Sequence, residues 1–115
     1  MDIHVHTDHN IDGREALATW VTGVIERSLD GVSQRISRVE VHLTDQNSDK
    51  KTRADDMRCV LEAKIDGRPP LAVSEQADTI HNAVIAGSEK LARLIDHTLE
   101  RVNDRAGSRS REALK

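Results

Sequence analysis

Apolar residues recur at helical spacing between residues 78 and 105. The recurring positions are Ile80, Val84, Gly87, Leu91, Leu94, Ile95, Thr98 and Val102. This period predicts a long amphipathic helix that buries one face. Asp78 or Thr79 can cap its first turn, and Arg105 suits the negative C-terminal end of the helix dipole. The long apolar stripe needs a cover, and the segments before it can supply one.

The exposed side of this helix carries charges of opposite sign on two flanks. We call Lys90, Arg93, His97 and Arg101 the basic flank, and Glu89, Asp96 and Glu100 the acidic flank. Both flanks are compatible with a solvated surface on which Glu89 and Arg93 form an i,i+4 ion pair. The basic flank is also suited to nucleic-acid phosphates, because cationic side chains displace condensed counterions there.

Four other segments alternate between apolar and polar residues, as half-buried strands do. They cover residues 1–7, 36–45, 57–65 and 71–76. In the first, Ile3 and Val5 face one way, and His4 and His6 face the other. Residues 46–56 are polar and are predicted to form a loop, whereas Asp66-Gly67 is a hairpin signal.

A second amphipathic helix is predicted over residues 13–29. Its apolar face consists of Leu17, Trp20, Val21, Val24, Ile25 and Leu29. Asp12 suits the N-cap position, with Glu15 as its capping-box partner. Asp30-Gly31 is a stop signal.

The order of elements is therefore β-α-β-β-β-α, an α+β fold. Each strand has one apolar face and each helix one apolar stripe, so two layers are the simplest arrangement. We expect a four-stranded sheet with both helices on one face and a polar open face on the other side. Residues 1–105 form one domain, and residues 106–115 a polar tail that we expect to be flexible.

Composition restricts the partners and the compartment. The 115 residues include 17 basic and 20 acidic side chains, for a net charge of −3, which argues against a strongly basic nucleic-acid binder but not against a local basic patch. The single cysteine, Cys59, permits no internal disulfide and fits a reducing compartment. We find no signal peptide or apolar membrane span, and expect a cytoplasmic protein.

Several short strings in the right order resemble one family. They are Glu15-Ala16-Leu17 before Trp20-Val21-Thr22; Ile36, Val39, Val41 and Leu43; Ile65-Asp66-Gly67 before Ala72-Val73-Ser74; and Lys90-Leu91-Ala92-Arg93. Over residues 1–105 the chain resembles the ribosome hibernation-promoting factor and protein Y family, also described as sigma-54 modulation protein or S30EA ribosomal protein, in its short form. The resemblance implies a fold similar to double-stranded RNA-binding domains. The chain departs from the family at Thr79, Ile80 and His81, where members carry Asp, an apolar residue and Tyr.

The resemblance also implies a function. Family members bind the decoding region of the small ribosomal subunit during stress and cover the messenger and transfer RNA sites. We therefore expect a non-enzymatic stress factor that binds ribosomal RNA and blocks translation by steric occlusion. The candidate RNA-binding residues are Lys90, Arg93, Arg101, His97, Arg14 and Arg27. The alternative is a protein-interaction or dimerisation module that keeps this fold without binding ribosomes, its partner meeting the open sheet face or an edge strand.

The histidines near the N-terminus suggest a metal site. His4 and His6 share a strand face, His9 follows, and His42 can lie on a neighbouring strand of that face. The string His4-Val5-His6 is similar to the paired ligands of large barrel hydrolases, but those enzymes need a longer chain and further ligands. We therefore favour a polar strand face without a metal or other cofactor. No Gly-rich phosphate loop or nucleophile elbow is present, and Cys59 is expected to be a buried structural thiol.

Overall fold

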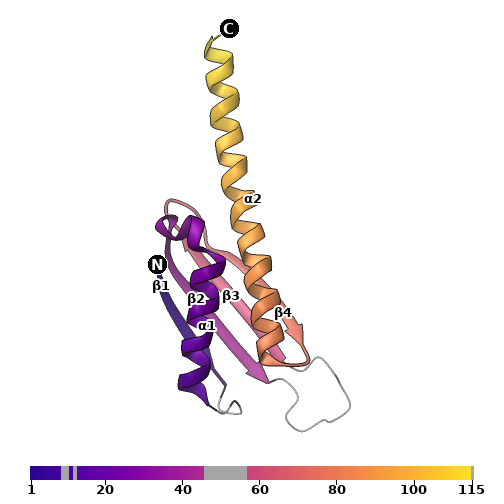
Figure 1. The fold of residues 1–115 in the computed structure, drawn as a ribbon. Helices are drawn as coiled ribbons and strands as arrows, with labels where there is room; N and C mark the ends of the chain where they lie inside the picture. The colour runs from indigo at the N-terminus through magenta and orange to yellow at the C-terminus, as the bar shows by residue number, and fades with distance from the viewer. Residues whose placement is uncertain (9–10, 12, 46–56, 115) are drawn as a thin grey trace.

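The computed structural model describes residues 1–8, 11, 13–45 and 57–114, with side chains as far as residue 100. In chain order the elements are β1 (Asp2–Thr7), α1 (Arg14–Ser28), the 3₁₀ helix η1 (Asp30–Arg35), β2 (Ile36–Asp45), β3 (Met57–Ile65), β4 (Leu71–Ala77) and α2 (Ile80–Leu114). Figure 1 shows this arrangement. The predicted order of strands and main helices is confirmed. The predicted loop at 46–56 lies outside the described residues.

The four strands form one sheet in the order β1-β2-β3-β4. β1 pairs with β2 in parallel through the crossover helix α1, and β2, β3 and β4 form an antiparallel meander. The turn into β4 is closed by a hydrogen bond from the Arg68 N–H to the Ile65 carbonyl (3.1 Å). Gly67 has a φ of 73°, which glycine adopts without the steric cost of a Cβ atom. The Asp66-Gly67 hairpin prediction is thus confirmed.

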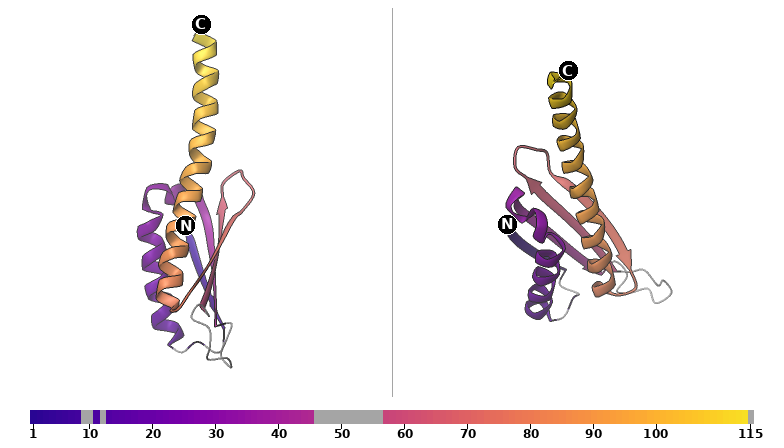
Figure 2. Two further views of the ribbon diagram at one scale, coloured as in Figure 1. Left: turned by 90° about the vertical axis from the view of Figure 1, so that its right-hand side faces the viewer. Right: turned by 45° about the horizontal axis from the view of Figure 1, so that its top comes forward.

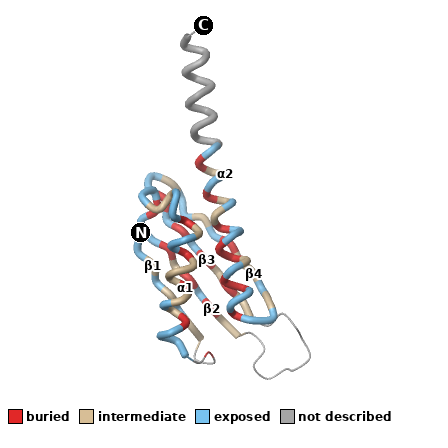
Figure 3. The backbone as a smooth tube through the Cα atoms, in the orientation of Figure 1, coloured by how far each residue is buried: buried red, intermediate tan, exposed pale blue. Residues whose placement is uncertain are grey.

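Both helices pack on the same face of the sheet, as Figure 2 shows from the side. Figure 3 places the buried residues where the helices meet the strands. The core combines inward strand residues with the apolar stripes of both helices. Its fully buried members include Val21, Ile25, Val39, Val41, Leu61, Leu91 and Ile95. The expected two-layer α+β architecture with one open, polar sheet face is therefore confirmed.

The long helix lies directly on the central strand β3. A Cβ atom added to Gly87 would stand only 2.6 Å from Leu61 Cδ1 and 3.5 Å from Cys59 Sγ. Because these distances leave no room for a side chain, glycine allows this close approach of α2 to the sheet. Leu99, which was not assigned to the apolar stripe, is 9% exposed and extends the buried face.

The helix ends differ in part from the sequence predictions. The N-cap of α1 is Gly13, in a left-handed conformation (φ 66°) without a side-chain cap, and Asp12 lies outside the described residues. In α2, Thr79 Oγ1 accepts a hydrogen bond from the Asn82 N–H (3.0 Å), which confirms Thr79 as a cap. Helix α2 runs to Leu114, past the end predicted at Arg105. The flexibility of the last ten residues stays a prediction.

The 3₁₀ helix η1 was not predicted. It follows the Asp30-Gly31 stop signal, and Val32 packs its side chain against the core. No helix in the described part of the chain is long and apolar enough to cross a membrane.

Candidate functional site

Lys90, the first member of the basic flank of α2, contacts the edge strand β4. Lys90 Nζ donates a hydrogen bond to the Ser74 carbonyl (3.2 Å) and forms an ion pair with Glu75 Oε1 (3.4 Å). About half of the Lys90 side chain remains exposed (48%). An exposed pair of this kind contributes at most about 1 kcal/mol, so Lys90 can exchange Glu75 for another anion.

Arg93 and His97 continue this flank one and two helical turns further on. Both are exposed, and neither side chain has a hydrogen bond or ion pair within the described ranges. The predicted Glu89–Arg93 ion pair is therefore not formed. The side chain of Arg101, the fourth predicted member, lies outside the description. Lys90, Arg93 and His97 thus lie along one exposed side of α2, with Lys90 in contact with β4.

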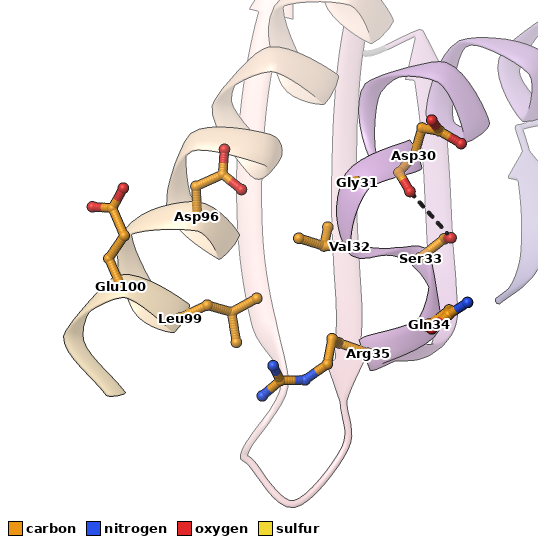
Figure 4. Close-up of a pocket in the computed structure, with 9 residues that line it drawn as sticks. All are labelled: Asp30, Gly31, Val32, Ser33, Gln34, Arg35, Asp96, Leu99 and Glu100. Carbon is orange, nitrogen blue, oxygen red and sulfur yellow. Dashed lines mark hydrogen bonds between the residues drawn. The ribbon is translucent and has the colours of Figure 1, made fainter. Parts of the chain in front are cut away.

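Two members of the acidic flank, Asp96 and Glu100, lie on the side of α2 that faces η1. Asp96 and Glu100 line a hollow of about 760 Å³ together with Leu99 and the whole of η1, as Figure 4 shows. Asp30 adds a third carboxylate and Arg35 a positive charge. The hollow therefore favours cationic partners over phosphates.

Arg14 and Arg27 are exposed at opposite ends of α1. Thirteen residues of helix separate them by about 20 Å. On α2, Asp96 and Glu100 lie beside η1, which follows α1 in the chain, whereas Lys90 lies beside β4. The six predicted RNA-binding residues therefore do not form one continuous strip: Lys90, Arg93 and His97 are brought together, whereas Arg14 and Arg27 are not.

A small apolar hollow lies between the first turns of the two helices. Its volume is about 460 Å³, and its lining includes Ile11, Leu17, Met57 and Ile80. Trp20 and His81 pack at its rim with ring centroids 4.4 Å apart.

The open sheet face brings together three side chains that are distant in the sequence. His6 in β1 lies directly opposite His42 in β2, and their rings stack with centroids 4.7 Å apart. His6 Nε2 lies 2.5 Å from Glu40 Oε2. We call His6, Glu40 and His42 the histidine cluster. Its ligand-type atoms all lie within 4.8 Å of one another.

Glu40 contacts two neighbouring side chains, one through each carboxylate oxygen. The hydrogen bond with His6 lowers the pKa of Glu40, and nearby positive charge from His6, His4 and Arg38 acts in the same direction, against a smaller opposing effect of desolvation. Arg38 Nε lies 3.4 Å from Glu40 Oε1, so each carboxylate oxygen has its own cationic or polar neighbour. Glu40 therefore favours its ionised form.

Sequence reasoning identified His6 and His42 but missed Glu40 as their partner. Alternation put Glu40 on the polar face of its strand, which was the only signal available. The register between β1 and β2 decides the contact, since it sets His4 opposite Glu40 and His6 opposite His42. His9, the other histidine considered, lies outside the described residues.

Comparison with known proteins agrees with this architecture. Residues 4–103 match the family described as sigma 54 modulation protein / S30EA ribosomal protein. The crystal structure of the Thermus thermophilus protein Y N-terminal domain is similar, with a TM-score of 0.66 and 17% identity over 85% of this chain and 99% of that one. A ribosomal subunit interface protein from Coxiella burnetii gives a TM-score of 0.63 and 14% identity over 87% and 99%.

At these identities the two solved structures establish a shared fold. No curated protein matches the chain in sequence. The family match, however, spans residues 4–103 of 115. The chain therefore belongs to the sigma 54 modulation protein / S30EA ribosomal protein family.

Proposed function

We propose that this protein binds the RNA of the small ribosomal subunit and blocks translation by occupying that surface. The observation that carries the proposal is the match of residues 4–103 to a family that includes the S30EA ribosomal protein. Family membership indicates a ribosome-associated factor. The similarity of this chain in fold to a protein Y domain and to a ribosomal subunit interface protein also supports a ribosome-associated role.

The basic flank is the surface that we assign to RNA. Arg93 and His97 are exposed and unpaired within the described residues, and Lys90 exchanges a weak surface ion pair for a phosphate. Arg101 extends the flank by sequence position. Each cation that neutralises a phosphate releases condensed counterions, so three such contacts lower affinity roughly 20- to 40-fold between 50 and 200 mM salt.

Occlusion requires shape and affinity but no chemical step. A rigid two-layer domain with an exposed cationic edge can lie against an RNA surface and exclude other ligands from it. We therefore propose a non-enzymatic role. Arg14 and Arg27 would then make separate contacts, because they lie at opposite ends of α1 and the basic flank lies on α2.

Co-sedimentation with purified small subunits, at 50 and 200 mM salt, tests the proposal. We expect binding at low salt that weakens as salt rises. The variant Lys90→Glu/Arg93→Glu should bind at least tenfold more weakly. The variant Lys64→Glu/Arg68→Glu makes the same change in charge away from the basic flank and serves as the matched control.

Circular dichroism must first show that both variants fold. A folded Lys90→Glu/Arg93→Glu protein that co-sediments like the wild type would refute the assignment of the basic flank. Occlusion is tested separately, by displacement of transfer RNA from small subunits. Binding without displacement would refute the blocking mechanism alone.

A protein-interaction module is the second candidate, and the hollow beside η1 favours it. Asp30, Asp96 and Glu100 line this hollow together with the apolar side chains of Val32 and Leu99, a combination that suits a basic, partly apolar peptide. A folded wild-type protein that fails to bind subunits at low salt would favour this function. Analytical ultracentrifugation of the protein alone would then test a homodimer.

A further inference from the structure

We propose that the histidine cluster on the open sheet face binds a zinc-type dication. His6 and His42 would supply imidazole nitrogens and Glu40 a carboxylate oxygen. This donor set of two imidazoles and one carboxylate is suited to borderline ions such as Zn²⁺, and poorly suited to Mg²⁺, which prefers oxygen. The inference is independent of ribosome binding, because the cluster lies on the face opposite α1 and α2.

The spacing of the donor atoms fits such an ion. Metal–ligand distances near 2.1 Å in a tetrahedron place ligand atoms about 3.4 Å apart. In the cluster, His6 Nε2 and Glu40 Oε2 are 2.5 Å apart, and all three donor atoms lie within 4.8 Å of one another. The rings of His6 and His42 are stacked with an angle of 14° between their planes, so the side chains must rotate about their own torsions before their nitrogens converge on one ion.

The backbone holds these side chains in place before an ion arrives. β1 and β2 are paired over six consecutive residue pairs, from Asp2 with Arg38 to Thr7 with Leu43. The opposite side of β2 is fixed in the core by Val39, Val41 and Leu43, each no more than 1% exposed. The ligand-bearing strands are therefore rigid, which reduces the entropy lost on binding.

Neighbouring groups orient the carboxylate and leave room for a further ligand. Arg38 contacts Oε1 of Glu40, whereas His6 contacts Oε2, so the second oxygen is the one directed into the cluster. A partner of this kind fixes the orientation of a metal-binding carboxylate. The His6 side chain is 53% exposed, which leaves the fourth position open to water.

The sequence argument against a metal was the lack of further ligands. Glu40 removes that objection, because it supplies the carboxylate that two histidines on neighbouring strands still required. His4 lies on the same face of β1 and opposite Glu40, but it is not part of the cluster.

Isothermal titration of the full chain with ZnCl₂ tests the proposal. We expect one Zn²⁺ per chain and no comparable heat with MgCl₂. We expect at least about tenfold weaker Zn²⁺ binding in each of the variants His6→Gln, His42→Gln and Glu40→Gln. Substitution of residues that only hydrogen-bond to metal ligands already weakens metal binding by that amount. Binding by Co²⁺ should give the visible absorption of a low-coordinate site, and this band should be lost in the same variants.

His4→Gln and His81→Gln are the matched controls. The first removes a histidine from the same strand face, and the second removes one from α2. Both should bind Zn²⁺ within about threefold of the wild type. An equal loss in His4→Gln would refute the proposed ligand set, and undiminished binding in His6→Gln/His42→Gln would refute the site altogether. Absence of Zn²⁺ binding to the folded wild type at millimolar concentration would do the same.

Discussion

The two faces of the sheet follow the same alternation but place their side chains in different surroundings. On the covered face, Val41 and Leu61 are fully buried against the helices. On the open face, His42 and Val60 are neighbours in the same pair of strands, yet His42 is exposed and Val60 half-buried. One residue along a strand therefore separates a position governed by packing from one governed by solvent and by its neighbours.

This difference shows which side-chain contacts can be predicted from the alternation of apolar and polar residues along a strand. The covered face needs only apolar side chains of suitable volume, which many sequences provide. The open face acquires a cluster of donor atoms only when particular residues of two strands face each other. Its chemistry therefore depends on strand register, which the alternation of a single strand does not encode.

Thiol labelling should give the largest contrast between the two faces. Burial under the helices raises the pKa of Cys59 to about 12, and the thiolate is the reactive form. At pH 8 we expect its reaction with a disulfide reagent to be roughly 1,000-fold slower in the native protein than in urea. The open-face control is Val60→Cys in a Cys59→Ala background, which should react rapidly while folded. Equal native rates for the two thiols would contradict the described burial.

Substitutions on the two faces of β3 should differ by several kcal/mol in their effect on the free energy of unfolding. Leu61→Ala leaves a cavity under α2 and should lower the free energy of unfolding by about 2–5 kcal/mol. Val60→Thr, at the adjacent position on the open face, should change it by less than about 1 kcal/mol. Urea denaturation followed by circular dichroism measures both values. Similar losses in the two variants would mean that the open face is covered in solution.

Substitution of two helix glycines should change the free energy of unfolding in opposite directions. Gly87→Val places a side chain against Leu61 and Cys59 and should lower the free energy of unfolding by about 1–3 kcal/mol. Gly23→Ala in α1 should raise it by about 0.5–1 kcal/mol, because alanine favours helix and the nearest neighbour is the mobile guanidinium of Arg27, 3.3 Å away. Thermal unfolding of both variants measures the contrast. Stabilisation by Gly87→Val would show that α2 does not lie directly on β3.

The main features of the fold were predictable, and the exceptions have physical causes. Apolar alternation located the four strands, and helical periodicity located both long helices. The 3₁₀ helix η1 was missed because its six residues make only about two turns, in which Val32 is the one apolar residue packed against the core. The cap of α1 was assigned to Asp12, whereas Gly13 holds that position through a left-handed backbone conformation.

The candidate sites were predicted less completely than the fold. The basic flank is readable from the sequence, because its members recur at three- and four-residue spacing on one helix, and its part in RNA binding stays a prediction. Its separation from Arg14 and Arg27 could not be predicted, since it depends on how α2 is rotated relative to α1. The role of Lys90 as a partner of Glu75 and Ser74 likewise depends on the position of β4.

The sequence by itself determined the element order, the buried face of each element and the sign of charge along α2. These properties follow from local periodicity, which each segment carries independently. Only the tertiary structure decided that Asp96 and Glu100 line a hollow beside η1, that Lys90 contacts β4, and that Glu40 joins His6 and His42. Such contacts join residues far apart in the chain, so they are fixed by strand register and helix packing and not by the pattern of any one segment.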